Sequence, residues 1–143
     1  MNMKVFQTAL ALLPLLAPLT THAEIVVFTG ARSDIESLSR NDVINIFMGR
    51  YRTLPNGQAA LPLEQEADAP ERRQFYLKLL NKRPEEIHAY WARLRFSGRT
   101  EPPRAISGRE DYLREIASTP GAIGYAERRA LTRDLRILLS LPE

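Results

Sequence analysis

Arg72 and Arg73 are the side chains with the clearest chemical potential, because they stand side by side at the predicted start of a helix. Planar guanidinium groups match carboxylate and phosphate, and a helix N-terminus attracts anions. Asp68 is the predicted N-cap of this helix, and Ala69 lies in its first turn. These four residues predict a site for a small oxyanion. The alternative is that both arginines are solvated and pair with the acidic residues around them.

Thr29 and Gly30 form the second candidate site, because they end the first predicted strand and open the loop that follows it. If that loop reaches the edge of the sheet where Arg72 stands, its backbone N–H groups could bind the same anion. A single glycine is also what an ordinary connecting loop contains, so that alternative stays open.

Residue types that catalyse reactions or bind metals are scarce in this chain. It has no cysteine, and His88 is the only histidine after residue 22. The chain lacks a Gly-x-Ser-x-Gly elbow, a phosphate-binding loop with lysine, and a His-Glu-x-x-His motif. Its 20 basic and 17 acidic residues are interleaved, which is unlike a nucleic-acid-binding surface. We therefore expect no enzyme, no metal or other cofactor, and no nucleic-acid partner.

Several aromatic side chains could instead line a binding surface. Tyr90, Trp91 and Phe96 have helical spacing, which favours packing in the core. Tyr51 stands in a long loop between two arginines and is the better candidate for an exposed partner contact.

The first 23 residues have the pattern of a secretory signal peptide. Lys4 precedes an apolar run from Val5 to Leu19, and Thr21-His22-Ala23 is a small-residue cleavage site. Cleavage would leave residues 24–143 as one domain, with no lipid-attachment cysteine and no membrane contact. An uncleaved membrane anchor is the alternative, although the apolar run is short for one. The expected location is the bacterial periplasm.

Strand and helix patterns alternate along the rest of the chain. Helix starts of the capping-box type are predicted at Ser39–Asp42 and at Ser107–Glu110. The predicted strands cover residues 24–29, 59–65, 122–125 and 135–139, and the predicted helices cover residues 39–49, 68–81, 84–94 and 107–116, with a loop at 97–103 and a helical turn at 127–131. This order predicts an α/β fold with a small mixed sheet flanked by helices.

Four segments resemble, in order, the periplasmic phosphate-binding protein family, a branch of the type II solute-binding proteins. Leu38–Arg50 is similar to the family's L-S…I-F-x-G-K/R helix, and Thr119–Tyr125 to its G-A-I-G-Y strand. Between them lie the loop, strand and helix of Pro55–Phe75, and a helix that carries Trp91 before a glycine-containing loop. The resemblance implies a stand-alone single lobe of the type II periplasmic binding protein fold, like the small proteins called phosphate transporter substrate-binding-like.

The resemblance also implies a function. Relatives are non-enzymatic substrate-binding proteins of phosphate ABC transporters and carry Ser-Gly-Thr at a helix start. Here Ala69, Pro70 and Glu71 occupy those positions, and Arg72 with the helix N-terminus is the remaining anion-binding feature. One expectation is therefore weak binding of phosphate or another small oxyanion. The alternative is an accessory module that has lost its ligand and uses its former cleft face to contact a protein partner or a second copy of itself.

Overall fold

In the computed structural model of the chain, residues 23–98 and 100–142 are described. Apart from Ala23, the predicted signal peptide lies outside the described residues. The elements follow one another as β1 (Ile25–Gly30), α1 (Arg40–Phe47), β2 (Leu61–Glu64), α2 (Pro70–Leu80), α3 (Pro84–Ser97), β3 (Arg104–Ala105), α4 (Arg109–Ser118), β4 (Ala122–Glu127), a 3-10 turn (Arg128–Ala130) and β5 (Leu135–Leu141). This is the predicted mixed α/β fold, with one five-stranded open sheet.

The sheet has the strand order β3-β2-β4-β1-β5. Strand β1 is antiparallel to both of its neighbours, β4 and β5, while β2 is parallel to β4 and to β3. Consequently β2 and β4 end at the same edge of the sheet, and β1 ends at the opposite edge.

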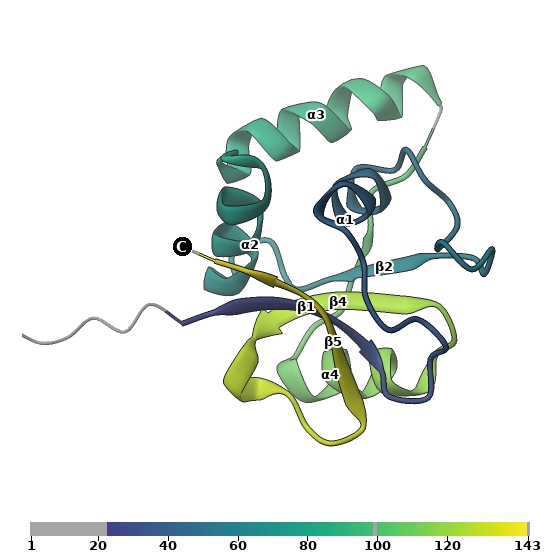
Figure 1. The fold of residues 1–143 in the computed structure, drawn as a ribbon. Coiled ribbons are helices and arrows are strands. Elements are labelled where there is room, and N and C mark those ends of the chain that lie inside the picture. Colours follow the sequence, from purple (N-terminus) through teal and green to yellow (C-terminus); the bar gives the residue numbers. More distant parts are fainter. Residues whose placement is uncertain (1–22, 99, 143) are drawn as a thin grey trace, which may run out of the picture.

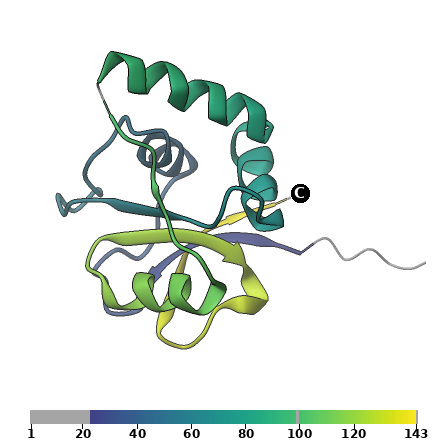
Figure 2. The ribbon, with the colours of Figure 1, turned by 180° about the vertical axis from the view of Figure 1, so that it is seen from behind.

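Helices cover both faces of the sheet (Figure 1). Helices α1, α2 and α3 lie on one face, where Phe47, Phe75 and Trp91 belong to the larger buried cluster. Helix α4 lies on the other face, where Tyr112 and Ile116 belong to a smaller cluster. The segment after α3 descends past β2 to reach α4 on this second face (Figure 2). Burying both faces is expected for a sheet with parallel strands.

Tyr112 of α4 bonds to the central strand β4 through its hydroxyl group. The hydroxyl accepts the backbone N–H of Tyr125 at 2.7 Å and donates to the carbonyl of Tyr125 at 2.9 Å. Gly124 makes this possible, because a Cβ at Gly124 would collide with the Tyr112 hydroxyl and with Ile116. On the opposite face the Tyr125 ring stacks on Phe75, with ring centroids 4.0 Å apart. The Gly-Ala-Ile-Gly-Tyr strand therefore connects α4 to the larger cluster.

Of the three predicted capping signals, one is confirmed and two are wrong. Ser39 and Asp42 form the predicted capping box at α1. The predicted N-cap Asp68 is wrong, because the N-cap of α2 is Ala69, which has no side-chain cap, and Pro70 follows at the first helical position. The predicted Ser107 capping box is also wrong: Gly108 is the N-cap of α4, and Ser107 donates to the Glu66 carboxylate instead.

Helix α3 runs farther than its apolar stripe predicts and ends at Ser97, inside the predicted loop. Trp91 is buried as expected, but the core assignment of Phe96 is wrong, because this ring is 98% exposed. The short edge strand β3 was not predicted. Among the described residues, no helix combines the length and the apolar character needed to cross a membrane.

Candidate functional site

The end of β2 and the start of α2 bring together a group of charged and polar side chains. This carboxyl-edge cluster consists of Glu64, Gln65, Glu71, Arg72, Tyr76 and Arg109. Strand β2 places Glu64, helix α2 places Glu71 and Arg72, and helix α4 places Arg109. The cluster lies where open α/β sheets carry their ligands, at the carboxyl ends of parallel strands.

Glu64 is a buried carboxyl group, with only 5% of the residue exposed. The Tyr76 hydroxyl donates to one of its oxygens, and Arg72 Nε lies 3.4 Å from the other. Burial raises the pKa of Glu64 to about 7, against the opposing influence of the Arg72 charge. Arg72 also lies over the Tyr76 ring, with its guanidinium carbon 5.2 Å from the ring centroid. This packing fixes Arg72 against Glu64 and Tyr76.

Glu71 is the second buried carboxylate, at 6% exposure. It accepts the backbone N–H of Glu127 at 2.9 Å and the side-chain amide of Gln65 at 3.1 Å, and it forms an ion pair with Arg109. A backbone N–H, an amide and a guanidinium are the donors that a bound oxyanion would use. The chain therefore supplies an internal anion at the start of α2.

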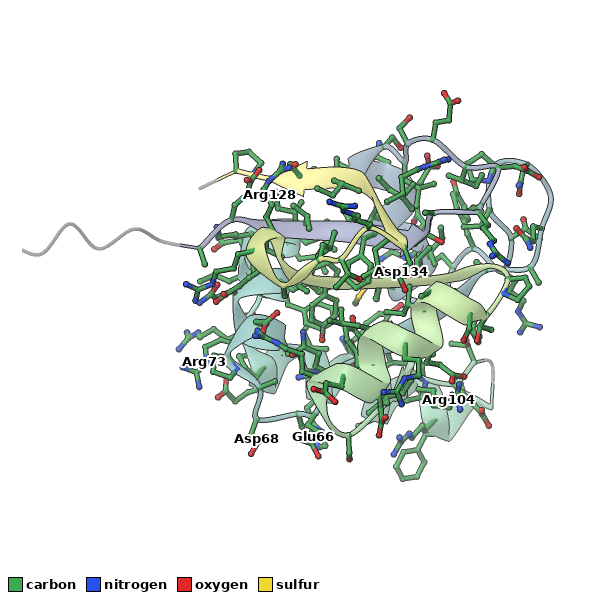
Figure 3. The ribbon with its side chains drawn as sticks, turned by 90° about the horizontal axis from the view of Figure 1, so that it is seen from below. Glu66, Asp68, Arg73, Arg104, Arg128 and Asp134 are labelled. Carbon is green, nitrogen blue, oxygen red and sulfur yellow. The ribbon has the colours of Figure 1, made fainter. Side chains whose placement is uncertain are left out.

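The predicted site residues around α2 have separate environments. Arg72 faces inward to Glu64, whereas Asp68 and Arg73 are exposed and point away from the body of the protein (Figure 3). Both Arg72 and Arg73 donate their backbone N–H groups to the carbonyl of Ala69, at 3.1 and 3.4 Å. Pro70 has no N–H to donate. The exposed Arg73 guanidinium is one of the predicted anion-binding features. It has no hydrogen-bond or ion-pair partner among the described residues.

Thr29 and Gly30 lie at the opposite edge of the sheet, so the expectation that they share an edge with Arg72 is wrong. Thr29 pairs with Ile123 near the start of β4, because β1 and β4 are antiparallel. The Thr29 hydroxyl donates to the Ala122 carbonyl at 2.7 Å, and a Cβ at Gly30 would meet the backbone of α4. Both residues line a separate hollow of about 640 Å³. Ligand binding there stays a prediction.

The sequence reasoning missed Glu64, Tyr76 and Arg109 as members of the site. Glu64 gives a local signal, because an acidic residue ends an otherwise apolar strand and stands a few residues before a helix. Arg109 gives no local signal in the sequence, because it belongs to helix α4, which lies far along the chain.

The carboxyl-edge cluster balances two carboxylates against two guanidinium groups. Within residues 23–98 and 100–142, no group of three or more acidic or histidine side chains could hold a metal ion. The charged side chains of the cluster therefore pair with one another.

Solved structures of phosphate-binding proteins share this fold. A receptor for ABC-type phosphate transport from Vibrio cholerae aligns with a TM-score of 0.64 at 10% identity, covering 81% of this chain and 45% of its own. A putative phosphate ABC transporter substrate-binding protein from Clostridium perfringens, solved with bound phosphate, aligns at 0.65 with 13% identity, covering 81% and 44%. PstS from Borrelia burgdorferi aligns at 0.60 with 14% identity, covering 81% and 46%.

This chain spans less than half the length of these structures. At such low identity the likeness shows the fold, which is that of about one half of a phosphate-binding protein, as the sequence resemblance implied. No protein-family model matches the chain, and no curated protein is similar to it by sequence.

Proposed function

We propose that this protein is a periplasmic, non-enzymatic binding module with a single solute-binding lobe, and that it acts by contacting a protein partner. In this role the lobe does not take up free phosphate. Its charged groups at the carboxyl edge hold the fold together, and its exposed surface makes the functional contacts.

The environment of Glu71 carries this proposal. Relatives with the resembling motif have a hydroxyl residue at this helix start, whereas here a carboxylate accepts the Glu127 N–H and pairs with Arg109. An incoming phosphate would have to displace this carboxylate or lie against its negative charge. Displacement would take the buried Glu71 carboxylate away from its Glu127 N–H and Gln65 donors. A buried polar group left without its partners costs roughly 1–3 kcal/mol, which offsets much of what weak anion binding provides.

A second candidate function is weak binding of phosphate or a similar oxyanion. The fold of the phosphate-binding proteins favours it, and so does Arg73, which is exposed at the start of α2. In that case the anion would bind on the surface, beside Arg73 and the first turn of the helix.

Calorimetric titration of residues 24–143 with inorganic phosphate separates the two functions. We expect no binding by the native protein at millimolar phosphate and measurable binding by Glu71→Thr, which removes the internal anion, restores a hydroxyl and frees Arg109. Asp68→Asn is the matched control, because it removes an exposed negative charge beside the same helix without releasing a guanidinium.

Phosphate binding by the native protein that Arg73→Ala abolishes would overturn the proposed function in favour of the second candidate. Binding by Asp68→Asn equal to that of Glu71→Thr would contradict the role of Glu71. A strictly monomeric protein that recovers no partner from periplasmic extract would count against the partner contact.

A further inference from the structure

A groove on the surface lies between the C-terminal part of α3, the loop after α1 and the segment Thr100–Arg104. It consists of two adjoining hollows of about 370 and 990 Å³. The two hollows share Arg52 and the whole Thr100–Arg104 segment as lining. We call this feature the loop groove. It is separate from the carboxyl-edge cluster, because none of the six residues of that cluster lines it.

The smaller hollow is mostly apolar. Phe47, Leu61, Pro102 and Trp91 line it, together with the half-exposed Tyr51. Trp91 is 94% buried, yet its indole N–H has no hydrogen-bond partner among the described residues. A buried donor without a partner is uncommon in folded proteins and costs roughly 1–3 kcal/mol. The smaller hollow thus offers apolar walls, and the Trp91 residue that forms part of them keeps its N–H buried.

The larger hollow is cationic. Arg52, Arg95 and Arg104 line it, against the single carboxylate of Glu101. The Arg95 guanidinium has no hydrogen bond or ion pair among the described residues. Arg104 pairs with Glu115 at 2.9 Å, but both side chains are largely exposed, so this pair is weak and easily exchanged.

We infer that the loop groove binds an acidic peptide segment of a partner protein, with one apolar side chain in the smaller hollow and carboxylates over the arginines of the larger one. This inference rests on the proposed function and names the surface and the kind of partner. Charge complementarity selects an acidic occupant, because three arginines and one carboxylate line the larger hollow and the Arg95 guanidinium has no partner among the described residues. The adjoining apolar hollow selects a segment that also carries an apolar side chain.

An extended segment fits this surface better than a compact anion does. Phosphate would use the arginines but leave the apolar hollow unfilled. A peptide brings carboxylates for the arginines and an apolar side chain for the smaller hollow. Contacts at partly exposed charges steer and orient the partner, while the smaller apolar hollow supplies most of the affinity.

Fluorescence of Trp91 gives a direct test, because it is the only tryptophan of the chain. The probe is the capped peptide Glu-Glu-Phe-Leu-Glu-Glu, which does not fluoresce in the tryptophan range. We expect saturable binding that changes the Trp91 emission and weakens as salt is raised. Replacing the apolar pair of the probe with alanines, or its glutamates with lysines, should lower the affinity at least tenfold.

Arg95→Glu should also weaken binding at least tenfold, whereas Arg133→Glu, a charge reversal at an exposed arginine before β5, should leave it unchanged. Trp91→Phe, followed by calorimetry, should weaken binding severalfold by reducing the apolar wall of the smaller hollow. If Trp91→Phe does not fold, the Arg95→Glu variant at an exposed position still tests the inference.

Equal binding of the lysine probe, no saturable binding of the acidic probe, or unchanged affinity in Arg95→Glu would each overturn the inference. The proposed function would survive these results if the native protein still ignores phosphate and a partner binds at another surface. Phosphate binding by the native protein would instead overturn the proposed function itself.

Discussion

Glu64 is the residue at which charge and burial conflict most strongly. Its carboxyl group ends a buried strand, and burial raises its pKa from 4.5 to about 7. A raised pKa means that the folded state favours the protonated form. The stability that Glu64 contributes is therefore fully present below pH 4.5 and is lost as the pH rises through about 7. The pKa difference corresponds to about 3 kcal/mol.

Glu64→Gln should accordingly stabilise the protein at pH 8 and have little effect at pH 5. The amide is uncharged at both values, so it avoids burying a negative charge while it keeps a hydrogen bond to Tyr76. Urea unfolding at the two pH values measures the difference in the free energy of unfolding. Glu36→Gln, at an exposed position, is the control. Stabilisation of the same size at both values would show that the Glu64 charge is not the cause.

Two side chains have the opposite exposure from the one that their local sequence suggests. Phe96 follows Trp91 by five residues, which turns it roughly 140° around the helix from the buried side of α3, so the ring is exposed. Glu71 is a charged residue at a helix start, yet it is buried, because its donors come from Glu127 and Arg109, far along the chain. The exposure of Phe96 follows from helix geometry, whereas the burial of Glu71 depends on contacts between distant segments.

Among the elements, strand β4 has an unusual dependence on a helix side chain. Its registered pairing with β2 covers Ala122 and Ile123, and beyond this point the Tyr112 hydroxyl bonds the backbone of Tyr125. The hydroxyl thus fills a place that a neighbouring strand would normally take. Gly124 leaves the space that this requires.

Tyr112→Phe should destabilise the protein by about 1–3 kcal/mol, because it leaves the backbone N–H of Tyr125 buried without its partner. The Tyr125 carbonyl keeps the Gln65 amide as a donor at 3.1 Å. The ring at position 112 itself remains, so little packing is lost. Tyr51→Phe is the matched control, since its side chain is 50% exposed. Chemical denaturation measures both changes. A Tyr112→Phe variant as stable as the control would mean that water or Leu63 substitutes for the hydroxyl.

The elements themselves could be largely predicted because their signals are local. The apolar spacing of α1 and the β-branched run of β1 lie within a few residues and are confirmed. Strand direction carries no such signal. The antiparallel pairing of β1 with β4 sends Thr29 to the edge opposite Arg72, and no pattern within either segment indicates this. The strand topology therefore places the two parts of the predicted site, at the end of β1 and at the start of α2, at opposite edges of the sheet. The elements that carry these two parts were themselves correctly predicted.

At the scale of the whole molecule, two apolar clusters lie on opposite faces of one sheet. Strands β1 and β4 supply both: Val27 and Tyr125 belong to the larger cluster, while Phe28 and Ala126 belong to the smaller. Because adjacent residues of a strand point to opposite faces, loss of packing on one face loosens the strands that support the other. We therefore expect the two clusters to unfold together.

Ile116→Ala tests this coupling, because Ile116 is fully buried under α4 whereas Trp91 belongs to the cluster on the other face. Truncation should cost about 2–5 kcal/mol, and urea unfolding followed by Trp91 fluorescence should show the whole loss. Far-UV circular dichroism should give the same midpoint, and Arg114→Ala, at an exposed position on α4, should change it little. If the Trp91 transition kept its native midpoint while the dichroism transition moved, the helix layers would unfold independently. The single lobe would then contain two cooperative units despite its shared sheet.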